Sequence, residues 1–416
     1  MNVGRNFLIY LFSSLLAGLL PLLLMPFLTR LLEPEEYGVM ITLTTLVMVT
    51  LPIINCGTIP YLGVQYFHIE RTQFVDILTS VLVVPMAITL ILVAVYALSA
   101  PWIAELLDVP IAWVPVVPIM AAAFFIPMVT LNLLRMRDQP FGYAALELSN
   151  AAVNFVMTIL LIFGLGLAWE GRLTAAFSAN ALTSIAAFIW LRRQGFLAGT
   201  FALAHLPSAI RFGAGVVPHD LANQAMRLAD RLIIAIIIGQ TALGSYGVAT
   251  QIASVMLVML GALNRAWTPF VFSTLKEDTE EARLRLVRRS YQVYLGLVLF
   301  FVAFNLVAPL VYSSLVDERY HDGAPAIFWL TLGYLFNGFY LTVVDRIFYL
   351  KKTHILAVVT VLNAVGSLSL SIALARGVGT VGVPIAFAAT SGVVMVAVFA
   401  LTQRLAPLPW FRALKP

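Results

Sequence analysis

The feature that most constrains this chain is a succession of long apolar runs along its whole length. About 20 apolar residues, at 1.5 Å per residue, cross a hydrocarbon core about 30 Å thick. Twelve runs meet this requirement, at about 7–30, 38–61, 77–99, 114–134, 143–164, 173–191, 212–238, 246–272, 291–312, 325–349, 355–375 and 380–402. Charged residues make up 11% of the chain, against about 25% in soluble domains. The sequence therefore predicts an all-α polytopic membrane protein.

The positive charges predict the orientation of these spans. With both termini in the cytoplasm, 18 of the 25 Lys and Arg residues fall on the cytoplasmic side. Four fall on the outer side, Arg30, Arg172, Arg319 and Arg376, and three lie inside spans, Arg227, Arg231 and Arg265. Cytoplasmic loops of membrane proteins are enriched in Lys and Arg, so this distribution favours cytoplasmic termini.

The connections between spans exclude several classes of function. The longest cytoplasmic ones, about 192–211 and 273–290, are too short for a nucleotide-binding domain, and the chain has no phosphate-binding loop or dinucleotide fingerprint. We expect no cofactor and no metal, and the energy must come from a gradient or a partner. The basic residues form no nucleic-acid-reading motif, so no nucleic-acid partner is expected despite a net charge of +5.

The two halves of the chain resemble each other at a shift of about 209 residues. Tyr37-Gly38-Val39 then falls on Tyr246-Gly247-Val248, and "APWIAELLD" (100–108) resembles "APLVYSSLVD" (308–317). Six spans per half give both halves one orientation, as in a parallel repeat about an axis along the membrane normal. The predicted domains are a six-helix bundle (1–191), a cytoplasmic linker (192–211), a second six-helix bundle (212–402) and a cytoplasmic tail (403–416).

The seventh predicted span carries a stripe of polar and charged residues. Its members are His219, Asp220, Asn223, Gln224, Arg227, Asp230 and Arg231, whose spacing places them on one face of a helix. Each central charge facing lipid would cost about 2.5–3.5 kcal/mol. The stripe must therefore face a wet cavity or polar partners. Arg265, in the eighth span, can face the same space, and the repeat places no charge at the corresponding positions of the first half.

Two interpretations of the charged stripe remain open. Asp230 can neutralise Arg231 or Arg227 within closed packing, which would make the stripe structural. Alternatively the three arginines bind an anion, which their excess over nearby acids favours for Arg227 and Arg265. Other intramembrane charges have simpler interpretations. Glu147 is interpreted as interfacial, and the adjacent Asp345 and Arg346 as neutralising each other.

Three stretches resemble bacterial polysaccharide-biosynthesis flippases. These are "PFLTRLLEPEEYGVM" (26–40), "RLADRLIIAIIIGQTALGSYGVATQIA" (227–253) and "LNRAWTPFVFSTL" (263–275). The first is similar to the first inter-helix turn of the Wzx-type O-antigen and exopolysaccharide translocases, the second to their seventh-to-eighth span signature and the third to the end of their eighth span. That family belongs to the multidrug/oligosaccharidyl-lipid/polysaccharide exporter (MOP) superfamily.

The resemblance implies a fold and a cargo. The fold would be MATE-like, with two six-helix bundles forming a V around a cavity open alternately to either side. The cargo would be an undecaprenyl-diphosphate-linked oligosaccharide, moved from the inner to the outer leaflet of the bacterial cytoplasmic membrane by a transporter, not an enzyme. The diphosphate and glycan would bind Arg227, Arg231, Arg265, Asn223, Gln224 and Arg30, while Asp230, Asp220 and His219 would serve ion coupling. A polysaccharide polymerase and a chain-length regulator are possible partners beside the lipid bilayer.

Three alternatives are less consistent with the sequence. A drug or cation exporter of the same superfamily would want acidic cavity walls, and a lipid II flippase usually carries two further spans. A membrane glycosyltransferase or polymerase would need a catalytic loop or an Asp-rich metal motif, and neither is present.

Overall fold

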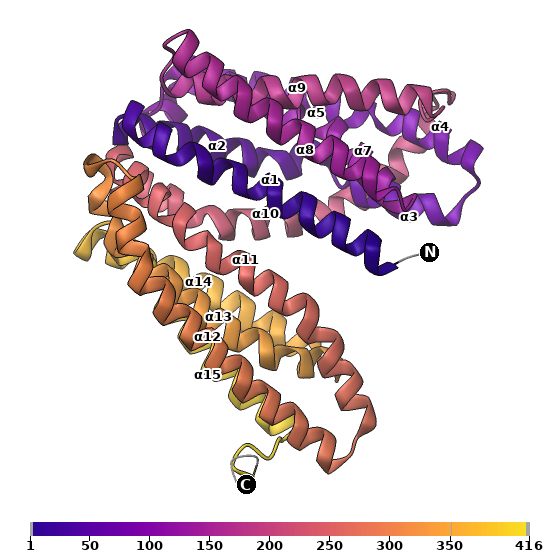
Figure 1. Ribbon diagram of the computed structural model, residues 1–416. Helices are drawn as coiled ribbons and strands as arrows, with labels where there is room; N and C mark the ends of the chain where they lie inside the picture. The colour runs from indigo at the N-terminus through magenta and orange to yellow at the C-terminus, as the bar shows by residue number, and fades with distance from the viewer. Residues whose placement is uncertain (1–2, 351, 413–416) are drawn as a thin grey trace. The chain divides into compact units, whose positions relative to one another are not determined.

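The computed structural model describes residues 3–350 and 352–412, and these residues are helical throughout apart from short connections (Figure 1). They form two compact units that divide between Ile236 and Ile237. The first holds α1 (Val3–Leu31), α2 (Pro34–Asn55), α3 (Thr58–His68), α4 (Arg71–Val81), α5 (Val83–Leu107), η1 (Ile111–Val116), α6 (Val117–Ala122), α7 (Phe125–Met136), α8 (Pro140–Ile159), η2 (Leu160–Gly164), α9 (Trp169–Arg193), η3 (Leu203–His205) and α10 (Leu206–Ile237). The second holds α11 (Gln240–Glu277), α12 (Glu280–Leu315), η4 (Glu318–Gly323), α13 (Ala324–Tyr349), α14 (Thr353–Val378) and α15 (Gly382–Leu405).

The predicted all-α membrane fold is confirmed. Within the described ranges, 11 helical segments are long and apolar enough to cross a membrane. The seventh predicted span, α10, is 32 residues long but is not among them because it carries the charged stripe. Counting α10 restores the twelve predicted spans, and no strand occurs in the described part of the chain.

The second predicted span, 38–61, is broken in the structure. It divides into α2 and α3 at Cys56 and Gly57, whose φ angles of 44° and 63° lie in the left-handed region. Gly213 of α10 packs against this break, since a Cβ added to Gly213 would lie 2.1 Å from the Cys56 carbonyl oxygen. In the second unit α11 runs unbroken through Pro269. The break between α2 and α3, against which α10 packs, therefore has no counterpart in α11.

The internal repeat is visible in the order of elements. In the first unit α5 ends at Leu107 and is followed by the 3₁₀ helix η1 and then α6. In the second unit α12 ends at Leu315 and is followed by the 3₁₀ helix η4 and then α13. Tyr37 and Tyr246, which align in the repeat, are both buried near the start of a helix. These correspondences support the duplication inferred from sequence.

The connection at 192–211 is held to the first unit. Arg71 donates a hydrogen bond to the Gln194 carbonyl oxygen (2.9 Å), and the Thr200 amide donates to Asp76 Oδ1 (2.7 Å). The next helix, α10, is also held there, by the Tyr61–Ser208 hydroxyl pair at 3.1 Å. By its contacts α10 therefore lies in the first compact unit, although the sequence placed the second bundle's start at 212. The functional division into six-plus-six bundles stays a prediction.

Helix α8 lies between α1 and α9 and packs against both (Figure 1). This position matters because a polar stripe runs along α8, as described below. The apolar core of the same unit lies where α4, α7 and α9 meet, around Phe74, Leu78, Leu133 and Leu191. A buried apolar cluster on these helices fixes the scaffold on which α8 and α10 carry their polar faces.

Candidate functional site

The charged stripe lies along α10, and its members differ in exposure. His219, Asp220, Asn223 and Arg227 are exposed, while Gln224, Asp230 and Arg231 are half-buried. The residues of α10 that are buried are small or apolar, among them Gly213, Leu228 and Ile234. The stripe is therefore the open face of the helix. The predicted grouping of these seven residues on one face agrees with the structure.

Hydrogen bonds along the stripe join residues one turn apart. Asn223 Nδ2 lies 3.0 Å from His219 Nε2, and the Arg227 guanidinium donates to the Gln224 side-chain oxygen. Both pairs are local and exposed. They join neighbouring side chains along the exposed face of the helix.

Arg231 extends the site toward the start of α2. It lies close enough to the Tyr37 hydroxyl to act on it electrostatically, and so does Arg172 of α9. Arg172, which was predicted to lie on the outer side, belongs to the first turn of α9 and donates to Asn154 Oδ1 of α8 at 2.8 Å. Helix α9 begins at Trp169, four residues before the predicted span, and the side of the membrane on which Arg172 lies stays a prediction. Two guanidinium groups and a buried tyrosine thus lie near one another in the first unit.

Arg30 and Arg265 complete the predicted anion-binding set. Arg30 lies in the last turn of α1 and is exposed. Arg265 lies in α11 of the second unit and is also exposed, on a helix that is apolar enough to span a membrane. Eight of the nine predicted site residues therefore belong to the first unit. That Arg265 faces the same space as Arg227 stays a prediction.

The ion pairs bear on whether the arginines are neutralised within the protein. The pairs found among the described residues are Arg283–Asp278, Arg285–Glu277, Arg319–Asp317 and Arg412–Glu280. None includes Arg227, Arg231 or Arg265. Asp230 has interactions of its own within the protein, so both interpretations of the stripe, closed packing and anion binding, stay predictions.

A second polar stripe, which the sequence analysis overlooked, runs along α8. Its members are Tyr143, Glu147, Asn150, Asn154 and Thr158, spaced by three or four residues and so on one helical face. Asn150 Nδ2 donates to Asn180 Oδ1 (3.3 Å) and Thr183 Oγ1 (3.0 Å) of α9. Glu147 instead contacts α1. The spacing could have revealed this stripe, but the partners on α1 and α9 could not be read from it.

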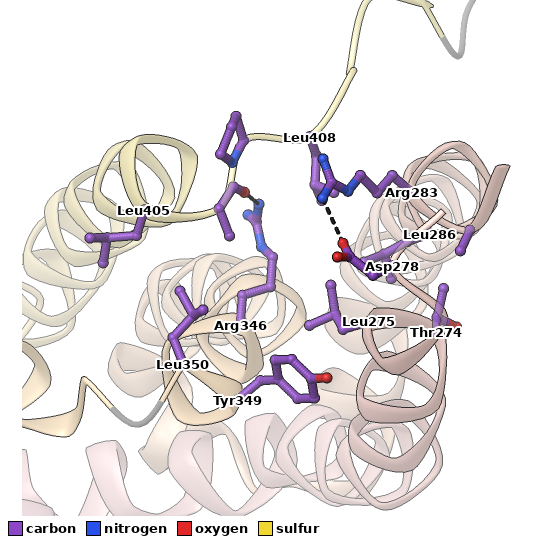
Figure 2. Close-up of a pocket in the computed structure, with 13 residues that line it drawn as sticks. Thr274, Leu275, Asp278, Arg283, Leu286, Arg346, Tyr349, Leu350, Leu405 and Leu408 are labelled. Carbon is purple, nitrogen blue, oxygen red and sulfur yellow. Dashed lines mark hydrogen bonds and ion pairs between the residues drawn. The ribbon is translucent and has the colours of Figure 1, made fainter. Parts of the chain in front are cut away.

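The structure also contains a cavity of about 230 Å³ at one end of the second unit (Figure 2). It lies between the ends of α11, α12, α13 and α15 and the segment after α15, and none of the nine predicted site residues lines it. Arg346 on its wall points toward the Ala406 carbonyl, and the Arg283–Asp278 pair lies across from it (Figure 2). The cavity is therefore separate from the charged stripe.

Arg346 has a structural role that the sequence analysis misassigned. Its guanidinium donates to Thr402 Oγ1 (2.8 Å) and the Ala406 carbonyl (3.2 Å), and it lies 5.9 Å from the centre of the Trp410 ring. It forms no ion pair with Asp345 among the described residues. The interpretation as a self-neutralised pair was wrong, because packing brings the end of α15 within reach of Arg346.

The all-helical fold with its candidate membrane spans is that of a multi-pass membrane protein, and it is similar to the fold of solved transporters and flippases. The chain superposes on an inward-facing multidrug resistance MATE transporter of the MOP superfamily with a TM-score of 0.70, at 16% identity over 93% of this chain and 94% of that chain. It superposes on the lipid II flippase MurJ in an inward closed conformation with a TM-score of 0.70, at 12% identity over 95% and 87% of the two chains.

Sequence comparison identifies the family. Residues 3–275 match the polysaccharide biosynthesis protein family, and the chain belongs to that family. It is also 24% identical over 285 residues to the Lsg locus putative protein 1 of Haemophilus influenzae, covering 67% of this chain and 68% of that protein. An uncharacterized membrane protein of the same organism is 23% identical over 290 residues, covering 67% of each chain.

Proposed function

We propose that the protein is a flippase that moves an undecaprenyl-diphosphate-linked oligosaccharide from the inner to the outer leaflet of a bacterial cytoplasmic membrane. It does so by alternating access, for the assembly of O-antigen or exopolysaccharide. The family match, the MOP-type fold and the relative named for the Lsg locus support this proposal. A polysaccharide polymerase and a chain-length regulator would take up the exported unit.

The charge of the cargo explains why the stripe is needed. A diphosphate is strongly hydrated, and hydrocarbon offers nothing to replace its water. Guanidinium groups donate paired hydrogen bonds to phosphate oxygens, so Arg227, Arg231 and Arg265 can replace that hydration. Asn223 and Gln224 can bind glycan hydroxyls, while the polyprenyl chain remains in lipid.

One observation carries the proposal. Arg227 and Arg265 lie on helices of a membrane protein, are exposed, and take part in none of the ion pairs found among the described residues. Arginines in such positions are costly and mark substrate pathways. An anionic cargo accounts for their retention.

The gradient that drives transport would act on the carboxylates of α10. Asp230 is half-buried one turn from Arg227, and Asp220 and His219 lie further along the same face. Protonation or cation binding at Asp230 would change the net charge of the stripe and so its affinity for the diphosphate. We propose that Asp230 is the principal coupling group, with Asp220 and His219 contributing.

The test replaces Arg227 or Arg265 by alanine. Each loses a charge-assisted hydrogen bond of about 1.5–3 kcal/mol, which weakens cargo binding about 10- to 100-fold. We expect export of surface polysaccharide to fall accordingly, with the amount of protein in the membrane unchanged. Arg288→Ala is the matched control, because Arg288 is an exposed arginine near the start of α12. Normal surface polysaccharide from both variants would refute the anion site.

The fold also suits a lipid II flippase, given its likeness to MurJ. The same arginines would then bind the diphosphate of lipid II. Purified protein in liposomes distinguishes the two cargoes, because movement of lipid II at the rate of the oligosaccharide lipid would favour this second function. A drug exporter would instead move organic cations in the same liposomes.

A further inference from the structure

Glu147 is a carboxylate on a membrane-spanning helix that the charged stripe of α10 does not include. It lies seven residues after the start of α8, about 10 Å along the helix, within a segment apolar enough to span the membrane. An ionisable group within such a segment, even near the edge where the sequence placed Glu147, is stabilised by polar partners. The partners of Glu147 therefore decide what it can do.

Two serines of α1 hold this carboxylate. Ser13 Oγ lies 2.8 Å from Glu147 Oε2, and Ser14 Oγ lies 3.0 Å from Oε1 and 3.1 Å from Oε2. Ser13 is 3% exposed and Glu147 is half-buried. Glu147 takes part in none of the ion pairs found in the described part of the chain. Neutral hydroxyl groups, and no cationic side chain, are its direct partners there.

Hydroxyl partners suit both protonation states of a carboxyl group. A hydroxyl can donate its one hydrogen and also accept, whereas Lys and Arg can only donate. Ser13 Oγ is also 3.1 Å from the Tyr10 carbonyl oxygen. When Glu147 is ionised, Ser13 can donate to it. When Glu147 is protonated, its O–H can donate to Ser13, and Ser13 can turn its hydrogen to Tyr10.

This exchange leaves the Ser13 hydroxyl and the Glu147 carboxyl group with a partner in either state. The cost of an unpaired buried polar group, about 1–3 kcal/mol, is thus avoided on both sides of the protonation step. A salt bridge would instead stabilise the ionised form alone. The hydroxyl partners of Glu147 therefore fit a carboxyl group in either protonation state.

The charged and titratable groups around Glu147 lie one turn or more away. Tyr10 of α1 and Tyr143 of α8 pack edge to face at 5.0 Å, and Arg135 of α7 lies 5.8 Å from the Tyr143 ring centre. Asp138, which follows α7, acts electrostatically on Tyr10 together with Arg135. From α9 the stripe meets the neutral Asn180 and Thr183, and Arg172 at the far end of the stripe is bonded to Asn154.

We propose that Glu147, with Ser13 and Ser14, is a proton-binding site through which a proton gradient acts on the first unit. Binding forms one O–H bond on the carboxylate from a proton of the adjoining water, and release reverses it. Proton binding as such is independent of the cargo. Its role in transport rests on the proposed flippase function, where it adds a second protonatable group to Asp230.

The experiment compares infrared difference spectra of the purified full-length protein between acidic and alkaline buffer. We expect a carboxylic-acid C=O band on acidification that Glu147→Gln removes. Gln keeps the shape and can still accept from the serines, so the variant should fold. Glu105→Gln is the matched control, since Glu105 is an exposed carboxylate on α5, and should leave that band in place. Ser13→Ala should shift its frequency.

A second measurement tests the role in transport. In liposomes, Glu147→Gln should lose the acceleration that a pH gradient gives to movement of the oligosaccharide lipid. An unchanged carboxylic-acid band in Glu147→Gln overturns the proposal, as does an unchanged response to the gradient. Removal of the wild-type band by sodium ions at constant pH would also overturn it, since the site would then hold sodium. The infrared spectra are recorded without cargo. If the arginine variants left export unchanged, the proposed flippase site would fail, but the infrared test of Glu147 would still stand.

Discussion

Replacing Arg346 by alanine should destabilise the second unit at the end where α15 finishes. Arg346 is 1% exposed, and its guanidinium holds Thr402 and the Ala406 carbonyl at 2.8 and 3.2 Å. It also lies over the Trp410 ring. Trp410 in turn donates to Gln403 Oε1 (3.0 Å) and stacks on Tyr294. Arg346 is therefore the polar centre of the contact between α13, the end of α15 and the segment that follows it.

The magnitude follows from the groups that lose their partner. Two hydrogen bonds from a charged donor contribute about 1.5–3 kcal/mol each, or about 3–6 kcal/mol together. The cation–π contact adds about 0.5–2 kcal/mol. Removing a buried charge also removes its desolvation cost, which returns part of this sum. We expect a net loss of about 2–4 kcal/mol in the free energy of unfolding.

The assay is thermal unfolding of the purified protein in detergent, together with chymotryptic cleavage at Trp410. Arg346→Ala should unfold at lower temperature and be cut faster. Arg404→Ala, which removes an exposed arginine from the last turn of α15, should match the wild type in both. Equal unfolding temperatures and cleavage rates for the two variants would refute the assignment of Arg346 as the anchor.

Two further predictions concern the first unit. Gly213→Ala should lower the free energy of unfolding by about 1–3 kcal/mol through overpacking, because the new Cβ would lie 2.1 Å from the Cys56 carbonyl oxygen. The control is Gly215→Ala, whose new Cβ meets nothing within 4 Å, and it should raise the unfolding temperature. Equal unfolding temperatures for the two variants would contradict the close approach of α10 to the break. Asp230→Asn should lose the response to an ion gradient. In liposomes it should move the oligosaccharide lipid, with a gradient present, only at the rate that the wild type shows without one. A preserved response to the gradient would exclude Asp230 as the coupling group.

The sequence by itself determined the fold class and the position of the charged stripe. Apolar runs of membrane-spanning length must become helices, because an unsatisfied backbone group in hydrocarbon costs several kcal/mol. The stripe of α10 followed from the same logic, since residues three and four apart share a helical face. Both inferences depend on spacing within one segment, so they needed no knowledge of how segments pack.

Tertiary structure decided which side chains meet across helices. The sequence did not indicate that Ser13 and Ser14 would bind Glu147, which lies more than 130 residues away in the chain. It also did not indicate that Arg346 would bind the end of α15 in place of its neighbour Asp345. The close approach of Gly213 to the break at Cys56 was equally hidden. Such contacts depend on the register between helices, and hydrophobic periodicity within a helix leaves that register open.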